Sequence, residues 1–457
     1  MWLAPILSHV STVALRIYYR LHRAGGQVPP NGPVLLVANH PNSLLDPAMV
    51  ALAAGRPVRF LAKAPLFTDP LVGFLVRGAG SIPVYRRVDD AAQVARNEEM
   101  FRAVHDALAH GAAVGIFPEG LSHNEPSLAP LKTGAARIAL GTLATHGIRV
   151  PIIPVGSVFR DKNIFRSEAL VTVGRAIQWE DLSPDAGGDG KGVRELTHRI
   201  DRALRDVTVN LEGWEDAGLV EIAEAIYAAE YGKASDLAAW VGRLRMTTET
   251  LTHLRQTSDG TVPLAKDISR HARILQRLGL RPRDLVEDPK RPGMLWWLMR
   301  RLPLGGVVPL AVLAIGTAVF FVPYRLTGIL ERKARPRDDV RATHKLLTGA
   351  ITFPLWIVAL ALFAGIIAGP LVGLLTFLAL PALGLFTLGL HEQWGQARTE
   401  ASRYMTLRRR QETLEPLREQ QRELAMRLKA VAEQRSGGAA NEARILSQVS
   451  AAPQREQ

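Results

Sequence analysis

Two long apolar stretches constrain the fold of this 457-residue chain more than any other feature. Leu304–Leu326 is uncharged up to Arg325 and is about as long as a bilayer crossing, and Leu347–Leu390 is almost twice that length. Because lipid offers the backbone no hydrogen-bond partners, such segments must be helical. Gly369-Pro370 interrupts the second stretch. The sequence therefore predicts one membrane span followed by a hairpin of two apolar helices.

Basic residues lie on every flank of these stretches and fill the linker between them. The positive-inside rule therefore gives no orientation. Three complete spans would place one basic flank on the wrong side, so a partly inserted or re-entrant segment remains an alternative. The surplus of 13 positive charges predicts an anionic partner. The long apolar runs favour a membrane over nucleic acid, because the cations flank them and form no aromatic-interleaved basic face.

The N-terminal residues 1–23 are apolar and end in Arg16, Arg20 and Arg23. A signal peptide has its charge first, so this order predicts an uncleaved helix at the membrane interface, with Tyr18 and Tyr19 as interfacial rings. An amphipathic helix docked on a soluble domain is the alternative. Because the chain also has no cysteine, we expect a membrane protein whose catalytic domain faces the cytoplasm.

Residues from about 30 to 180 alternate apolar strands with helical patterns, which predicts an α/β domain of a sheet flanked by helices. Helices are expected from Asp89 to His110 and from Thr133 to His146. The predicted strands are Val34–Asn39, Val58–Ala62, Ser81–Val84, Ala113–Phe117, Val150–Val155 and Leu170–Val173.

A histidine stands at the end of the first predicted strand, and Asp46 follows six positions later. A carboxylate can hold the imidazole of His40 so that it takes a proton from a hydroxyl near neutral pH. The alternative is structural, because Asp46-Pro47 is also a good helix start. Without cysteine there is no thiolate nucleophile or disulfide, and without a Gly-x-Ser-x-Gly turn no serine elbow. The attacking hydroxyl is therefore expected to belong to a substrate.

Four blocks follow in order within this region. They are Asn39-His40 with Asp46, Gly80–Arg87, Phe117-Pro118-Glu119-Gly120 with Leu131–Gly134 behind it, and Val150–Gly156. Together they resemble the glycerolipid acyltransferase superfamily, which includes the glycerol-3-phosphate and lysophosphatidate acyltransferases. This resemblance implies a mixed β-sheet flanked by helices, with C-terminal transmembrane helices after the catalytic domain.

The chain departs from the usual family pattern in two places. Five residues separate His40 from Asp46 where four are usual, a spacing similar to that of members that acylate glycerol-3-phosphate or dihydroxyacetone phosphate. The third block continues Leu121-Ser122-His123, so an arginine often found there is missing. His123 is interpreted as a loop residue, and a second polar contact in the site is the alternative.

The resemblance implies a role for each block. His40 would be the general base and Asp46 its partner. Glu119 and Gly120 would bind the acceptor, and Asn39 and Pro118 would support the site. The substrate phosphate would be bound by Arg86, Arg87 and Lys132. No metal is expected, because the other histidines show no paired ligand spacing, and no cofactor besides acyl-CoA or acyl-carrier protein as co-substrate.

The sequence thus predicts a membrane-bound O-acyltransferase of phospholipid biosynthesis acting on glycerol-3-phosphate. A lysophosphatidate acyltransferase is the alternative within the class, and a catalytically silent lipid-binding scaffold is the alternative outside it. The expected partners are membrane lipids, the acyl donor and the phosphorylated glycerol. The C-terminal leucine stripe leaves open an oligomer or packing on the chain itself.

The predicted domains are an interfacial helix (1–23), an acyltransferase domain (24–210), a helical extension (211–300), membrane segments (301–391), an amphipathic or coiled-coil-like helix (392–434) and a disordered tail (435–457).

Overall fold

The computed structural model describes residues 3–85, 97–184, 190–211, 213–232, 237–257, 261–286, 307–409 and 411–450. The chain divides into two compact units. The first comprises Met1–Asn210 and Thr327–Ala350, and the second comprises Leu211–Leu326 and Ile351–Gln457. The first unit therefore includes the N-terminal segment and a short C-terminal segment that the sequence did not assign to it.

The first unit is built on a mixed sheet of seven strands in the order β1-β7-β6-β2-β5-β3-β4. Six pairs of neighbours hold it together, and all are parallel except β6 with β7. The strands are β1 (Arg20–Gly25), β2 (Val34–Ala38), β3 (Val58–Lys63), β4 (Ile82–Val84), β5 (Ala113–Ile116), β6 (Ile152–Phe159) and β7 (Glu168–Val173). The mixed sheet and its flanking helices confirm the predicted fold class.

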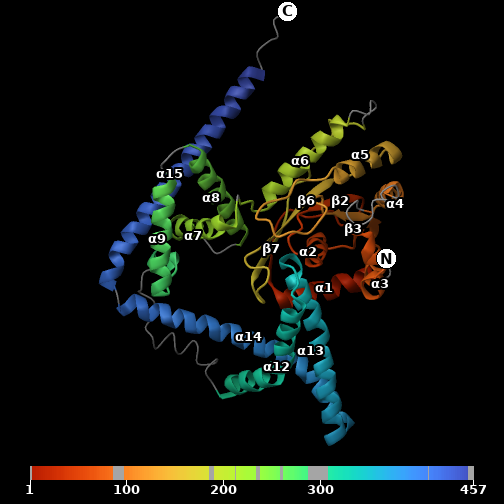
Figure 1. The fold of residues 1–457 in the computed structure, drawn as a ribbon, viewed down its shortest axis with the longest axis vertical. Helices are drawn as coiled ribbons and strands as arrows, with labels where there is room; N and C mark the ends of the chain where they lie inside the picture. The colour runs from red at the N-terminus through yellow and green to blue at the C-terminus, as the bar shows by residue number, and fades with distance from the viewer. Residues whose placement is uncertain are drawn as a thin grey trace, which may run out of the picture. The chain divides into compact units, whose positions relative to one another are not determined.

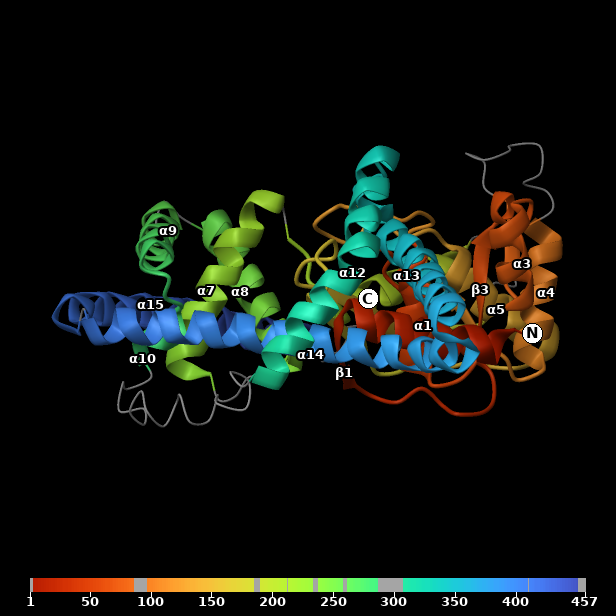
Figure 2. The same ribbon diagram turned by 90° about the horizontal axis from the view of Figure 1, so that it is seen from below.

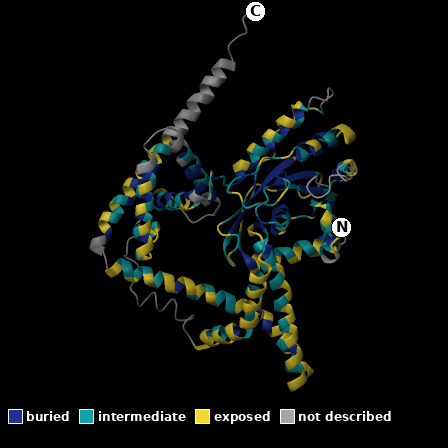
Figure 3. Ribbon diagram, viewed as in Figure 1, coloured by how far each residue is buried: buried dark blue, intermediate teal, exposed yellow. Residues whose placement is uncertain are grey.

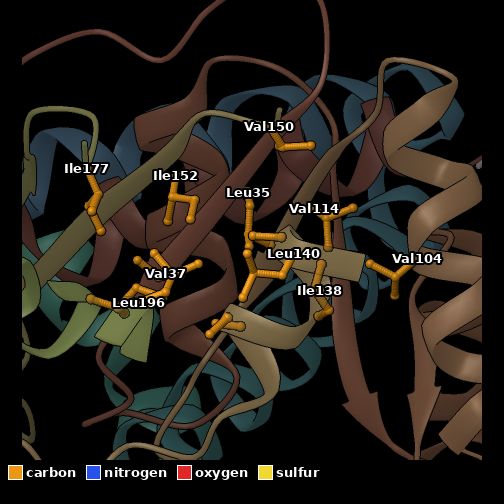
Figure 4. Close-up of a cluster of buried hydrophobic side chains, with 14 of the residues drawn as sticks. Leu35, Val37, Val104, Val114, Ile138, Leu140, Val150, Ile152, Ile177 and Leu196 are labelled. Atoms are coloured by element: carbon orange, nitrogen blue, oxygen red, sulfur yellow. The ribbon is translucent and has the colours of Figure 1, made fainter. Parts of the chain in front are cut away.

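Strand β2 lies at the centre of the sheet, and all its residues are buried. Its side chains alternate between two cores. Leu35 and Val37 pack with α4 (Asn97–Ala109), α5 (Gly134–His146) and α6 (Lys191–Val207), as Figure 4 shows for part of this cluster. The other side chains of β2 pack against α1 (Ala4–Tyr18) and α2 (Leu45–Ala54). The central strand is therefore fixed from both faces, which makes its C-terminal end a rigid platform.

All six predicted strands are present, and every strand end lies within four residues of the predicted one. Strand β1 was not predicted. Helix α1 ends at Tyr18, and Arg20–Gly25 pairs with Glu168–Val173 at the edge of the sheet. The predicted helix through Arg23 is therefore wrong at its end. Tyr18 and Tyr19 are buried in the core instead of lying at a membrane interface as predicted.

The remaining short elements of the first unit are η1 (Ala64–Phe67) and α3 (Pro70–Gly78), which connect β3 to β4. A further contribution comes from α13 (Asp338–Ala368), whose residues up to Ala350 belong to this unit. Ala342 of this helix is fully buried in the core formed with α1 and α2. The layers of sheet and helices can be followed in Figure 1.

The second unit begins with the helices α7 (Trp214–Tyr231), α8 (Leu237–Thr257), α9 (Thr261–Leu278) and α10 (Pro282–Val286). They agree with the predicted helical extension as far as residue 286. Helix α15 (Gln411–Ser450) runs alongside them in both views (Figures 1 and 2). Leu414, Leu424 and Leu428 of the predicted leucine stripe are buried. The stripe therefore packs on its own chain, and α15 continues past the predicted start of disorder at residue 435.

Within the described residues, three helices are long and apolar enough to cross a membrane: α12 (Val307–Ala334), α13 and α14 (Pro370–Arg409). Gly369 separates α13 from α14 with a φ of 97°, so the interruption lies where the sequence predicted it. Many of their large apolar side chains are exposed, and these helices are largely yellow and teal in Figure 3. Exposed apolar surface of this extent fits lipid as the surrounding solvent.

Candidate active site

The candidate catalytic pair, His40 and Asp46, is assembled where the central strand ends. His40 follows β2 by two positions, and Asp46 lies in the first turn of α2. Nδ1 of His40 is 2.8 Å from Oδ2 of Asp46, and the carboxylate side chain is fully buried whereas the imidazole is 19% exposed. An ionised carboxylate accepts the Nδ1 proton, which leaves Nε2 as the basic nitrogen.

A tight turn closes the distance between these residues. The backbone carbonyl of Asn42 accepts a hydrogen bond from the N–H of Leu45, and Ser43 has a φ of 46°. Few residues other than glycine adopt this left-handed conformation, and such strain persists only where the surroundings hold it. The backbone N–H of Asn42 also donates to Oδ2 of Asp46 at 2.6 Å. The turn thus shapes the catalytic pair directly.

The carboxylate of Asp46 is poorly compensated for a buried charge. Its Oδ1 accepts no hydrogen bond from the residues that the structure describes. Burial raises the pKa of Asp46 above its usual range, while the hydrogen bonds from His40 and Asn42 act in the opposite direction. A proton arriving on His40 would relieve this imbalance, because an imidazolium compensates the carboxylate.

An aromatic side chain from the neighbouring strand fixes the plane of the imidazole. The ring of Phe117, one residue past β5, stacks on His40 with 4.1 Å between ring centroids and 14° between planes. Phe60 on β3 continues the stack at 6.0 Å from Phe117. The sequence analysis quoted Phe117 in its block but gave it no role. Its place directly after an apolar strand next to β2 was the available signal.

Glu119 ties the two strand ends together. Its Oε1 accepts the backbone N–H of His40 at 2.7 Å, and its Oε2 accepts the N–H of Ala129 at 2.9 Å and contacts Nε2 of His123. The side chain is buried. Glu119 therefore holds the backbone of His40, and its predicted contact with the acceptor stays a prediction.

His123 lies in the loop after β5, as predicted, and it also makes a polar contact in the site, which was the alternative interpretation. Its backbone N–H donates to the carbonyl of His40 at 3.3 Å, and its Nδ1 accepts the N–H of Glu125 at 3.1 Å. The hydrogen bond with Glu119 raises the pKa of His123 above its ordinary value of 6.5, and burial opposes this shift.

The residues of this site lie in a region that is similar to known proteins. Residues 22–158 match the family model described as Acyltransferase. This region belongs to the glycerolipid acyltransferase superfamily. The matched residues include His40 and Asp46 as well as Phe117 and Glu119. The contacts described above therefore lie within the acyltransferase domain.

Two similar proteins from Saccharomyces cerevisiae are glycerol-3-phosphate O-acyltransferases. Number 1 is 28% identical over 275 residues, which cover 56% of this chain and 36% of the relative. Number 2 is 34% identical over 134 residues, 29% of this chain and 18% of the relative. The human 1-acyl-sn-glycerol-3-phosphate acyltransferase alpha is 30% identical over 171 residues, 36% of this chain and 56% of the relative. The chain thus spans about a third and a fifth of the length of the two yeast relatives.

Among solved structures, the 1-acyl-sn-glycerophosphate acyltransferase of Thermotoga maritima matches with 19% identity and a TM-score of 0.33. The match covers 44% of this chain and 78% of that chain.

The predicted phosphate ligands of the acyltransferase domain are only partly described. Arg86 and Arg87 lie outside the described residues. Lys132 is exposed, and its backbone N–H donates to the carbonyl of Pro118 at 2.8 Å. Gly120 has a φ of 76°, and a Cβ there would lie 2.6 Å from Nζ of Lys132. The structure therefore brings Gly120 and Lys132 together, and their roles in acceptor and phosphate binding stay predictions.

The supporting residues act through the backbone. Nδ2 of Asn39 donates to the carbonyl of Ser157 at 3.0 Å, and the N–H of Ser157 donates to Oδ1 of Asn39 at 2.8 Å. This side chain extends the pairing of β2 with β6 beyond Ala38. The strand end that carries His40 is therefore braced on both sides, by Asn39 toward β6 and by Glu119 toward β5.

Proposed function

We propose that this chain is a membrane-bound O-acyltransferase that moves a fatty acyl group from an acyl thioester to a hydroxyl of glycerol-3-phosphate. The observation that carries the proposal is the His40–Asp46 pair, joined at 2.8 Å at the rigid end of β2 within an acyltransferase domain. A lone buried aspartate at a helix start would need no histidine. The contacts from Asn42, Phe117 and Glu119 all serve to place this one imidazole.

The chemistry requires a base and no enzyme nucleophile. Nε2 of His40 takes the proton of the acceptor hydroxyl as its oxygen attacks the thioester carbonyl. The carbon–sulfur bond then breaks, and the departing thiolate takes the proton back from the imidazolium. Asp46 stabilises the imidazolium between these two steps. The products are an ester and a free thiol, and the histidine is regenerated.

Glycerol-3-phosphate is favoured as acceptor by the extent of similarity. The match with yeast glycerol-3-phosphate O-acyltransferase 1 covers 56% of this chain, whereas the match with the human lysophosphatidate-type relative covers 36%. Similarity to the yeast relative therefore reaches beyond the acyltransferase domain. Lysophosphatidate is the second candidate, because this chain covers more than half of the human relative's length.

The membrane assignment rests on two features. The helices α12, α13 and α14 are long and apolar enough to span a bilayer. Helix α1 exposes an apolar stripe of Ile6, Val10, Val13 and Ile17, spaced as one helical face. Such a stripe suits the headgroup boundary, where an acyl chain can pass between membrane and site. We place the catalytic domain on the cytoplasmic side, with acyl-CoA or acyl-carrier protein as the donor.

The test is thiol release by detergent-purified protein supplied with palmitoyl-CoA and either glycerol-3-phosphate or lysophosphatidate. The chain contains no cysteine, so a thiol-reactive dye reports only the CoA released. We expect release with glycerol-3-phosphate, lost in His40→Ala and in Asp46→Asn. Preference for lysophosphatidate would support the second candidate. Lack of release with both acceptors, and with an acyl-carrier-protein donor, would overturn the enzymatic proposal in favour of a lipid-binding scaffold.

A further inference from the structure

The loop between β6 and β7 contacts the turn that joins His40 to Asp46, although this loop lies about 120 positions further along the chain. Nζ of Lys162 donates a hydrogen bond to the backbone carbonyl of Pro41 at 2.8 Å. Pro41 is the residue between His40 and the left-handed turn at Ser43. The ammonium thus binds the backbone of the segment whose conformation brings Asp46 to His40. No motif in the sequence points to this contact.

The same loop is held by the end of α1. The hydroxyl of Tyr19 donates to the backbone carbonyl of Lys162, and it accepts a hydrogen bond from Nδ2 of Asn42 at 2.9 Å. Because the backbone N–H of Asn42 donates to Asp46, Tyr19 is two contacts away from the catalytic carboxylate. Tyr19 is fully buried. Lys162 is therefore fixed by its own backbone as well as through its ammonium.

The first turns of α13 hold the loop from another direction. Nζ of Lys345 donates to the backbone carbonyl of Asn163 at 2.9 Å. On the same helix, Oδ2 of Asp339 accepts a hydrogen bond from the hydroxyl of Ser122 at 2.7 Å, next to His123. Two loops that border the catalytic pair thus contact the part of α13 that belongs to the first unit.

Charge adds a second effect to the geometry. Lys162 is half-buried, and burial lowers the pKa of its ammonium, while Asp46, Asp338 and Asp339 oppose this shift. In return, the charge of Lys162 acts to lower the pKa of Asp46. It acts in the same direction on His123. A cation at this point therefore makes a proton on the neighbouring groups less favourable.

We propose that Lys162 is a positioning residue for His40: its ammonium holds the Pro41 carbonyl, and with it the turn that brings Asp46 to His40. This role rests on the acyltransferase function proposed above. Tyr19 and the first turns of α13 fix Lys162 in turn, so both terminal parts of the first unit contribute to the geometry of the site. The contact that performs this role is the hydrogen bond from the Lys162 ammonium to the Pro41 carbonyl oxygen.

The test compares Lys162→Met with Lys162→Arg and with Lys266→Met, which removes an exposed lysine of α9. Methionine keeps most of the length of lysine and removes the donor and the charge. We expect kcat to fall about tenfold in Lys162→Met, as for other residues that orient a reactive group. Lys162→Arg should recover most of this loss, and Lys266→Met should match the wild type.

The pH profile separates positioning from a merely structural role. The titratable and charged groups around the pair are the neutral phenol of Tyr19 from the end of α1, Glu119 and His123 after β5, Lys162 after β6, and Asp338 and Asp339 from α13. Removing the Lys162 cation from this set removes a charge that lowers the pKa of Asp46, the partner of the base. The acidic limb of the kcat/KM profile should therefore move to higher pH in Lys162→Met.

Three outcomes would overturn the proposal. The first is an unchanged acidic limb in folded Lys162→Met. The second is a rise in KM for glycerol-3-phosphate with kcat intact, which would make Lys162 a substrate ligand. The third outcome matters if Lys162→Met fails to fold. In that case Tyr19→Phe, which removes only a hydroxyl, is measured instead, and a wild-type kcat in this variant would contradict the proposal. If the wild-type protein releases no thiol, the proposed function itself is contradicted. This result differs from a failure of the Lys162 inference, in which the wild type is active.

Discussion

The central sheet and the apolar helices of the C-terminal half use the same residue types in opposite ways. Every residue of β2 is buried, and its leucines and valines fill the cores on both faces. In α13 the comparable side chains face outward, for example Leu355 and Leu362, which are 64% and 62% exposed. Water drives the apolar residues of the first region inward, whereas the second region has the length and composition of helices whose apolar side chains face lipid. The burial of apolar side chains therefore reports on the stability of the fold in the first region, and their exposure reports on the surrounding solvent in the second.

The largest expected effect tests whether chemistry is confined to the first region. His40→Ala removes the base while the buried contacts of β2 remain, so we expect thiol release to fall about 10³-fold. Membrane association should not change, because no span contains the residue. Turnover and the fraction of protein in the membrane pellet are measured in parallel. Residual turnover within a few-fold of the wild type would place the base elsewhere.

A second comparison concerns stability. Leu36→Ala leaves a cavity in the fully buried core between β2 and α2, which should cost about 3 kcal/mol in the free energy of unfolding. Leu362→Ala removes an exposed side chain of α13 and should cost less than about 0.5 kcal/mol in detergent. Denaturant unfolding followed through tryptophan fluorescence and circular dichroism measures both. Equal costs would mean that α13 packs as a core helix.

Membrane insertion inverts this order. Leu355→Asp places a carboxylate on the exposed face of α13, at an expected cost of about 3 kcal/mol for insertion. Val286→Asp changes a residue that is 44% exposed outside the three apolar helices, and it should leave insertion unchanged. Alkaline extraction of membranes reports the fraction that remains inserted. If Leu355→Asp resisted extraction like the wild type, α13 would not face lipid at this position.

Sequence reasoning was most successful where the physical signal was local. The strands around the site are short apolar runs bounded by proline, glycine and polar residues, and the His40–Asp46 contact follows from six residues of sequence. Strand β1 was missed because Arg-Leu-His-Arg has no apolar alternation, and its pairing depends on β7 far along the chain. Lys162 and Asp339 were missed for the same reason, since their partners are distant in sequence.

The smallest expected effect concerns His123, which joins the two loops of the first region by a titratable contact. Its pKa is raised in the folded protein, mainly by the hydrogen bond with Glu119. A raised histidine pKa means that the folded state binds the proton more tightly than the unfolded state. The stabilising contribution is therefore complete below the ordinary value of 6.5 and is lost as the pH rises through the folded value. Wild type should gain stability relative to His123→Gln on acidification through this window.

The measurement is the difference in unfolding midpoint between these two proteins at a series of pH values. His146→Gln serves as the control, because this histidine at the end of α5 meets the more exposed carboxylate of Asp106. A difference for His123→Gln that is constant with pH would show that the neutral imidazole supplies the whole contact with Glu119. The charge of His123 would then contribute nothing to holding the loop after β5 against the backbone of His40.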